Sequence, residues 1–326
     1  MDPNEIATHR RRLVGSWCPQ EPTPRQQTAL EAMSKREMLY GGAAGGGKSS
    51  WLLMEALRYV HVPGYSAIIF RRTSPQLHQS DGLIPRSKEW LATSAAEWSV
   101  QHATWTFPSG ATLKFAHLQY DNDKYDYQGG AFQFIGWDEL THFLESQYTY
   151  LWSRLRKPMD AKKALSSIPD RFRAASNPGG IGHDWVKQRF LIEQDPNRMF
   201  VPAKLGDNPY IDTEDYLQNL ENLTPHELSQ LRDGNWDARP PGAMFNRAWF
   251  QQIDTAPVHV SQRVRSWDIA ATTPKPGTDP DYTVGTLMSR NEHADCTLED
   301  VIRGRWSPAG VDQAMLSAAK TDPEGT

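Results

Sequence analysis

A glycine-rich segment that ends in a lysine and a serine has the clearest chemical meaning in this chain. From Gly42 to Ser49 it fits the pattern G-x-x-x-x-G-K-S, which is typical of phosphate-binding loops. In such loops glycine lets backbone N–H groups approach phosphates, the lysine reaches the β- and γ-phosphates, and the serine hydroxyl coordinates Mg²⁺. We therefore predict that Lys48 is catalytic and that ATP, with Mg²⁺, is bound by Gly42, Gly45, Gly46, Gly47, Lys48, Ser49 and Ser50.

Two adjacent carboxylates end an apolar run further along the chain. The run Phe132–Trp137 leads directly into Asp138 and Glu139. We expect Asp138 to hold the Mg²⁺ ion with Ser49, and Glu139 to be a catalytic residue that polarises the attacking water. Two carboxylates are needed because metal binding and base catalysis are different tasks.

Three further positions are candidates for recognising or sensing the nucleotide. The amide of Gln26 could read the adenine edge, or the residue could simply begin a solvated helix. Arg71 follows the apolar run Ala67–Phe70, at the strand end where open α/β sheets bind ligands. It could sense phosphate, contact DNA or belong to a surface pair. Ser176 and Asn177 end another strand and could bond the γ-phosphate or its water, or form a plain turn.

These positions require an α/β fold with a mostly parallel sheet. Short apolar runs precede the glycine loop, the arginine and the carboxylates, and a helical pattern follows the loop. Such runs are typical of buried parallel strands. The segment Trp105–Phe115 alternates apolar and polar residues around Pro-Ser-Gly, which predicts a hairpin that decorates the sheet edge.

The pattern changes in the last third of the chain. Residues 206–256 are polar and helical, with Thr224 as an N-cap and Pro225 at the first helical position. Pro240-Pro241-Gly242 then breaks the structure. Beyond Val258 the sequence predicts strands and a closing helix, over Arg263–Ala270, Asp281–Met288, Cys296–Arg303 and Ala309–Ala319.

Length and composition limit the class of protein. The 326 residues are enough for two domains, and no apolar run approaches the roughly 18 residues of a membrane span. A net charge of −4 argues against a uniformly basic surface but leaves room for a local basic groove. Two distant cysteines suggest neither a disulfide framework nor a zinc site. We expect a protein of a reducing cytoplasm with no membrane partner.

Together these motifs resemble the large terminase subunit of tailed bacteriophages, the motor that packages DNA into procapsids. The resemblance covers nearly the whole chain from about residue 20, and the blocks around Asn177 and Trp236 are more specific than the glycine loop. The segments that carry it are Gly42–Ser49, Phe70–Thr73, Trp137–Thr141, Ser153–Arg156, Ser176–Trp185, Leu231–Trp236 and Ser266–Ala271.

The resemblance implies three parts. They are a P-loop ATPase domain of the additional-strand type (1–205), a lid or linker subdomain (206–257) and an RNase H-like nuclease domain (258–326) that is truncated in this chain. Such nucleases hold two Mg²⁺ or Mn²⁺ ions between carboxylates. By analogy Asp268 is a catalytic residue and the first metal ligand, and Asp281 is a second candidate. We predict that this chain has no nuclease activity by itself.

The same resemblance implies the function and the partners. The function is ATP-driven translocation of double-stranded DNA into procapsids, with an endonuclease that cuts the concatemer in full-length members. The partners are the small terminase subunit, the capsid portal protein and further copies in a ring, commonly a pentamer, in the host cytoplasm and transiently at the portal vertex. Many relatives have an arginine finger before the glycine at 129, where this chain has Gln128. The candidates are Arg154, Arg156 and Arg71.

Two other functions fit parts of the sequence. A nucleic-acid helicase also places a glutamine before its phosphate loop and Asp-Glu in its second motif, but the last third of this chain does not resemble a second motor domain. A non-catalytic assembly protein could bind ATP as a structural ligand. The joint presence of Lys48, Asp138 and Glu139 favours hydrolysis over that alternative.

Overall fold

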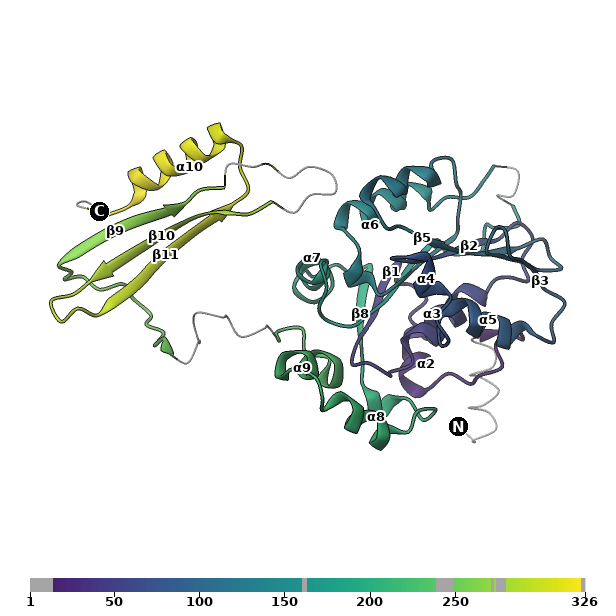
Figure 1. The fold of residues 1–326 in the computed structure, drawn as a ribbon. Helices are drawn as coiled ribbons and strands as arrows, with labels where there is room; N and C mark the ends of the chain where they lie inside the picture. Colours follow the sequence, from purple (N-terminus) through teal and green to yellow (C-terminus); the bar gives the residue numbers. More distant parts are fainter. Residues whose placement is uncertain (1–13, 160–162, 239–248, 271–272, 274–279, 324–325) are drawn as a thin grey trace. The chain divides into compact units, whose positions relative to one another are not determined.

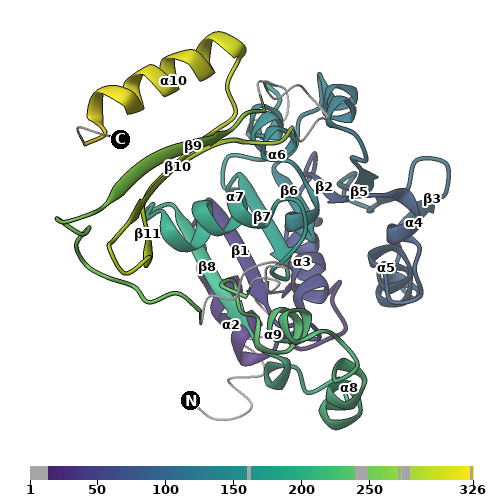
Figure 2. The same cartoon turned by 60° about the vertical axis from the view of Figure 1, so that its left-hand side comes forward.

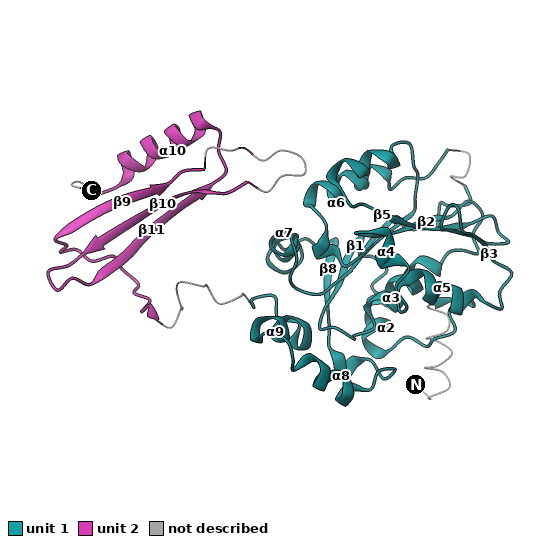
Figure 3. Ribbon diagram, in the orientation of Figure 1, with its two compact units in different colours: residues 1–240 teal, residues 241–326 magenta. Residues whose placement is uncertain are grey.

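The computed structural model describes residues 14–159, 163–238, 249–270, 273, 280–323 and 326. The chain forms two compact units, residues 1–240 and 241–326 (Figure 3). This division falls inside the segment 206–257 that the sequence assigns to a lid or linker, and the three-domain boundaries stay a prediction. The predicted break at Pro240-Pro241-Gly242 lies outside the described residues.

An eight-stranded sheet forms the centre of the first unit (Figure 1). In spatial order the strands are β3 (Glu97–Ser99), β4 (Thr104–Thr106), β5 (Thr112–His117), β2 (Ser66–Arg71), β6 (Phe134–Asp138), β7 (Arg171–Ser176), β1 (Glu37–Gly42) and β8 (Arg198–Ala203). From β5 to β8 in this spatial order, neighbouring strands are parallel. At the other edge, β3 and β4 pair antiparallel.

The position of β7 defines the type of sheet. This strand lies between β1, which leads into the glycine loop, and β6, which ends in Asp138. The mostly parallel α/β fold with an additional strand, as predicted, is therefore confirmed. The expected hairpin is also present, because Thr104–Thr106 pairs antiparallel with Thr112–Lys114 near the sheet edge.

Helices cover both faces of the sheet, which explains why its central strands are buried throughout (Figures 1 and 2). Along β1, Met38 and Tyr40 join one apolar core while Leu39 joins the other. The helices that contribute to the first core are α2 (Pro24–Glu31), α3 (Lys48–Leu57), α4 (Ser74–Leu77) and α5 (Leu83–Leu91). The second core includes α6 (Glu145–Leu151), α7 (His183–Lys187) and the π-helix η4 (Gln188–Ile192).

Short helical segments complete the first unit. The 3₁₀ turns are η1 (Asp121–Tyr127), η2 (Leu140–His142), η3 (Trp152–Arg154) and η5 (Leu205–Asp207), and two polar helices follow, α8 (Thr213–Leu220) and α9 (Pro225–Asp233). Helix α9 begins as predicted, with Thr224 as N-cap and Pro225 at the first helical position. The Thr224 N–H donates to the Glu227 carboxylate at 3.1 Å.

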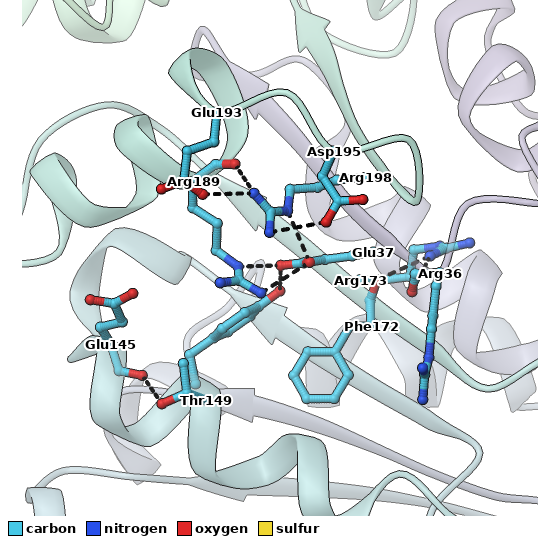
Figure 4. Close-up of polar contacts among 11 residues, drawn as sticks. Arg36, Glu37, Glu145, Thr149, Phe172, Arg173, Arg189, Glu193, Asp195 and Arg198 are labelled. Carbon is cyan, nitrogen blue, oxygen red and sulfur yellow. Dashed lines mark hydrogen bonds and ion pairs between the residues drawn. The ribbon is translucent and has the colours of Figure 1, made fainter.

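A buried carboxylate fastens the amino end of β1 to three other elements (Figure 4). Glu37 accepts hydrogen bonds from Arg189 of η4 at 2.5 Å, from Arg198 of β8 at 3.1 Å and from Tyr148 of α6 at 2.8 Å. Its side chain is only 6% exposed. The three partners satisfy the charge that burial would otherwise penalise.

The second unit contains a three-stranded antiparallel sheet and one helix. The strands are β9 (Gln262–Asp268), the central β10 (Thr283–Arg290) and β11 (Cys296–Gly304), and the helix is α10 (Pro308–Thr321). This is the predicted order of three antiparallel strands and a helix. Arg265 of β9 pairs with Asp300 of β11 and with Asp322 just beyond α10, which fastens these elements together.

No helix in the described parts of the chain is both long and apolar enough to cross a membrane.

Candidate functional site

The glycine loop follows β1 directly and leads into α3, so its position is set by the sheet. Gly42 has φ +133, and a Cβ there would lie 2.5 Å from the Ala203 carbonyl oxygen of β8. Gly47 has φ +73, and a Cβ there would lie 2.7 Å from the Gln26 amide nitrogen. Glycine is therefore required by conformation and by space at Gly42, and by conformation at Gly47.

Lys48 is buried at the first position of α3. Its Nζ donates to the Ala43 carbonyl at 2.5 Å, inside the same loop. Burial lowers the pKa of the Lys48 ammonium, while the nearby Glu139 and Asp138 carboxylates oppose that shift. A phosphate group could replace the carbonyl as the partner of this ammonium, because both are oxygen acceptors.

Ser49 and Arg71, from two different elements, both contact Asp138 at the end of β6. The Ser49 hydroxyl donates to Asp138 Oδ1 at 3.1 Å, and Arg71, at the end of β2, donates to Oδ2 at 2.9 Å. Arg71 also lies 3.9 Å from Glu139. Burial raises the pKa of the Asp138 carboxyl, and Arg71 is the strongest influence in the opposite direction.

Glu139 connects the end of β6 to the end of β7. Its backbone is left-handed, with φ 55, a conformation that is uncommon outside glycine and clusters at functional sites. Its Oε2 accepts from the Asn177 N–H at 3.1 Å, and the neighbouring Ser176 hydroxyl accepts from the Thr141 N–H at 3.1 Å. The side-chain oxygen of Asn177 is buried and has no partner within the described residues. Glu139, Ser176 and Asn177 are thus brought together as expected.

Gln26 is close to the loop but its amide is already bonded. Its Nε2 donates to the Gly47 carbonyl at 2.8 Å, and its Oε1 accepts from the Thr23 N–H at 2.9 Å as part of a helix capping box. Through these two hydrogen bonds, Gln26 connects the start of α2 to the glycine loop. Each bond uses one of the two donors or one of the two acceptor sites of the amide, and recognition of adenine by Gln26 stays a prediction.

A cavity of about 550 Å³ lies beside the glycine loop. This volume suits a small-molecule ligand. Gln26, Lys48 and Glu139 all line it. It also includes residues that the sequence analysis did not single out, namely Gln20, Arg86, Asn208, Tyr210 and Tyr216. No local pattern marks these residues, because they lie in irregular segments or on ordinary helices and reach the loop only through the fold.

The segment that ends α9 packs directly on the glycine loop. The Ala44 N–H donates to the Leu231 carbonyl at 2.6 Å. Gly234 caps the helix with φ 65, and a Cβ there would lie 2.6 Å from the Ala43 nitrogen. This close approach explains the glycine in the Gly-Asn-Trp block.

Two residues further on, Trp236 contacts the loop that follows β7. It is 5% exposed and stacks on His183, with ring centroids 5.5 Å apart. The Gly179 N–H donates to His183 Nδ1 at 2.9 Å, so the neutral ring carries its proton on Nε2 and donates to the Trp236 carbonyl at 3.1 Å. The end of α9 therefore contacts both the glycine loop and the Asn177 loop.

The arginine-finger candidates lie elsewhere in the unit, with the exception of Arg71. Arg156 donates to the Gly129 carbonyl at 2.7 Å, and Arg154 packs over the Tyr150 ring at 5.7 Å. The backbones of both pair with Phe132, which precedes β6. They are therefore at the amino edge of the sheet, and neither lines the cavity around Lys48.

The nuclease candidates lie in the second unit. Asp268 is exposed at the end of β9, and Asp281 precedes the start of β10. Asp300 is paired with Arg265 at 2.7 Å. The described residues contain no group of three or more His, Cys, Asp or Glu side chains that could hold a metal ion. The nuclease assignment of Asp268 and Asp281 stays a prediction.

A phosphate-binding loop, a strand-terminal Asp-Glu pair and an inserted strand between them define a P-loop nucleotide-binding protein of the additional-strand type. Residues 39–252 match the family model described as terminase large subunit, T4likevirus-type, N-terminal. The chain belongs to this family of large terminase subunits.

Solved structures with the same fold include the large terminase of a thermophilic bacteriophage, which is 13% identical, with a TM-score of 0.54 over 94% of this chain and 76% of that chain. The complex of that terminase with ATP-gamma-S is also 13% identical, with a TM-score of 0.53 over 93% and 74% of the two chains. Its ADP complex is 13% identical and has a TM-score of 0.51 over 96% and 74%. No curated protein matches the chain in sequence.

Proposed function

We propose that this chain hydrolyses ATP to drive double-stranded viral DNA into procapsids. The observation that carries the proposal is the convergence of Lys48, the Ser49–Asp138 pair and the Glu139–Asn177 pair at the carboxyl edge of one sheet. Family membership supports the packaging role, and the fold shared with nucleotide complexes of a phage large terminase supports nucleotide binding.

Each residue has a distinct role in the proposed reaction. Lys48 binds the β- and γ-phosphates and offsets the charge that develops in phosphoryl transfer. Glu139 accepts a hydrogen bond from the attacking water and orients it towards the γ-phosphate. The Asn177 N–H donates to Glu139, and its buried side-chain oxygen, which has no partner among the described residues, would accept a second hydrogen bond from that water. Arg71 holds both carboxylates in position.

The residues around Asp138 fit a Mg²⁺ ion. The Ser49 hydroxyl and Asp138 Oδ1 lie 3.1 Å apart, and hydroxyl and carboxylate oxygens are the ligands that Mg²⁺ uses beside phosphates and water. When bound, the ion neutralises charge on the β- and γ-phosphate oxygens. One protein carboxylate is enough to bind Mg²⁺ at this site, because the ion retains several waters.

The wider assignment extends the same proposal. The expected partners are double-stranded DNA, the small terminase subunit, the capsid portal and further copies of this chain in a ring, in the host cytoplasm at the portal vertex. The site of this chain has no contribution from Arg154 or Arg156. Their place at the opposite edge of the sheet suits an arginine finger supplied to a neighbouring copy. A metal-dependent nuclease with Asp268 and Asp281 belongs to the family proposal for residues 258–326.

The test is phosphate release from ATP with Mg²⁺, with and without linear double-stranded DNA, by the unmodified chain, Lys48→Ala and Glu139→Gln. We expect Lys48→Ala to abolish nucleotide binding. We expect Glu139→Gln to bind ATP normally but to hydrolyse it at least about 100-fold more slowly, the usual size of a general-base contribution. Binding without hydrolysis by the unmodified chain, even when concentrated to favour a ring, would instead support a non-catalytic ATP-binding assembly protein.

A further inference from the structure

An arginine from outside every recognised motif reaches the glycine loop. Arg86 lies in α5, and its Nη1 donates to the Ser50 hydroxyl at 2.7 Å. Ser50 belongs to the first turn of α3, directly after the Lys48-Ser49 pair. Arg86 also lines the cavity of about 550 Å³ together with the loop residues Gly45 to Ser50.

The guanidinium is held in a way that leaves it available to an anion. Its other polar partner is the carboxylate of Asp81, whose side chain is 90% exposed, whereas the Arg86 side chain is 18% exposed. A pair with so exposed a carboxylate is weak, because water screens it. A phosphate oxygen could therefore take over one arm of the guanidinium while the other keeps Ser50. Arginine suits this task because its planar fork binds phosphate with paired hydrogen bonds.

The neighbours of Arg86 indicate which phosphates it would contact. The Ser49 hydroxyl faces Asp138, and these two residues would hold a Mg²⁺ ion. The Ser50 hydroxyl instead faces Arg86. Ser49 and Glu139 line both this cavity and a second one that includes Arg71 and Asp138, whereas Arg86 lines only the first. Arg86 thus contacts α3 at Ser50, one residue further along the helix than Ser49.

We propose that Arg86 is a nucleotide-binding residue that contacts the α- and β-phosphates from α5, in the same chain as the loop. This inference rests on the proposed nucleotide site and adds a residue to it. It also assigns Arg86 to ground-state binding, which an arginine finger for the γ-phosphate would not share. ADP and ATP both carry the α- and β-phosphates, so they should be affected alike.

The test measures equilibrium binding of ADP and of ATP, each with Mg²⁺, to the full chain. We expect Arg86→Ala to weaken both nucleotides by about tenfold or more and by similar factors, the usual effect of losing a charged hydrogen bond. Arg86→Lys should recover part of the affinity. The matched control is Lys88→Ala on the same helix, because Lys88 packs over Trp98 at 5.2 Å and does not line the cavity. It should leave both affinities unchanged.

Several outcomes would overturn the inference. Unchanged affinity in Arg86→Ala would refute it, and weakening of ATP alone would reassign Arg86 to the γ-phosphate. Asp81→Asn should bind ADP at least as well as the unmodified chain, and a tenfold loss there would mean that the Asp81–Arg86 pair is structural. If Arg86→Ala unfolds, Arg86→Gln replaces it. Failure of the unmodified chain to bind either nucleotide would refute the proposed function itself, which distinguishes the two failures.

Discussion

Among single residues, Arg71 has the largest influence on the charge of Asp138, the carboxylate that we propose to bind the metal ion. Burial raises the pKa of Asp138, and the Arg71 guanidinium 2.9 Å away is the main group that lowers it. Asp138 must be deprotonated to bind a metal ion. An arginine at this strand end therefore keeps the site competent at lower pH than burial alone would permit.

The first prediction concerns the pH dependence of Arg71→Ala. Removing the positive charge raises the pKa of Asp138, so the loss of metal binding on the acidic side begins at higher pH. We expect the acidic limb of kcat/KM for ATP hydrolysis to move to higher pH. Arg71→Lys, which keeps the charge, should show a smaller shift. An acidic limb at the same pH in all three chains would contradict this assignment.

The sequence predicts the site residues that belong to short motifs and misses those that do not. Lys48, Ser49, Asp138 and Glu139 are recognisable because the chemistry of phosphate and metal binding fixes their spacing. Arg86 is not recognisable, since an arginine in an amphipathic helix is usually a surface residue. It reaches the loop only because α5 packs against α3. The roles of Gln26, Arg154 and Arg156 likewise depend on contacts that no local pattern encodes.

Among the elements, the strands could be predicted but their order could not. Apolar runs mark β1, β2 and β6, because strands buried on both faces are rich in apolar residues. Strand β7 instead carries Arg171 and Arg173, which are buried and pair with Glu55 of α3. The insertion of β7 between β1 and β6 is a pairing of segments far apart in the chain, and the sequence indicates it only through the family resemblance. The short β3 and the π-helix η4 have no clear sequence signal.

The second prediction concerns the contact between α9 and the glycine loop. Gly234→Ala would place a Cβ 2.6 Å from the Ala43 nitrogen, at a residue with φ +65. We expect it to lower the free energy of unfolding by more than about 1 kcal/mol and to weaken ADP binding, since the loop must move. Gly110→Ala is the control, because Gly110 has φ +82 but nothing within 4 Å of its Cβ position. Equal effects of the two substitutions on ADP binding would exclude a steric link to the loop.

The third prediction concerns the Glu37 cluster drawn in Figure 4. Glu37→Gln leaves Arg189 and Arg198 without their buried partner, and such losses cost about 3 kcal/mol. We expect a drop of that order in the free energy of unfolding, measured with urea. Glu193→Gln is the matched control, because Glu193 also pairs with Arg198 but is 50% exposed. It should cost less than about 1 kcal/mol. Similar losses for both would show that burial of Glu37 is unimportant.

For the whole molecule, the two units differ in the candidate functional residues that they contain. The first unit contains the glycine loop and the residues that we propose for metal binding and for orienting the attacking water. The second unit presents Asp268 on an exposed strand end, and no group of potential metal ligands surrounds it among the described residues. The net charge of −4 also means that DNA contacts must come from local basic regions.

The fourth prediction follows for nuclease activity. Two-metal cleavage needs several carboxylates around ions about 4 Å apart, and the described residues supply no such group. We expect no cleavage of supercoiled plasmid by this chain with Mg²⁺ or Mn²⁺, as judged by gel electrophoresis. Asp268→Ala provides the control for contaminating nuclease. Cleavage that disappears in Asp268→Ala would overturn the prediction and establish a working nuclease site.

The contact of α9 with the glycine loop has a mechanical consequence. The chain runs from the hydrogen bond between Leu231 and Ala44, past the stack of Trp236 on His183, and on towards residue 241, where the second unit begins. Tension applied along the chain from that side would first load the contacts of Ala238 with Gln230 and of Asp237 with Lys187, and then those of Trp236 and Leu231. These contacts form one continuous path from the carboxyl end of the first unit to the glycine loop.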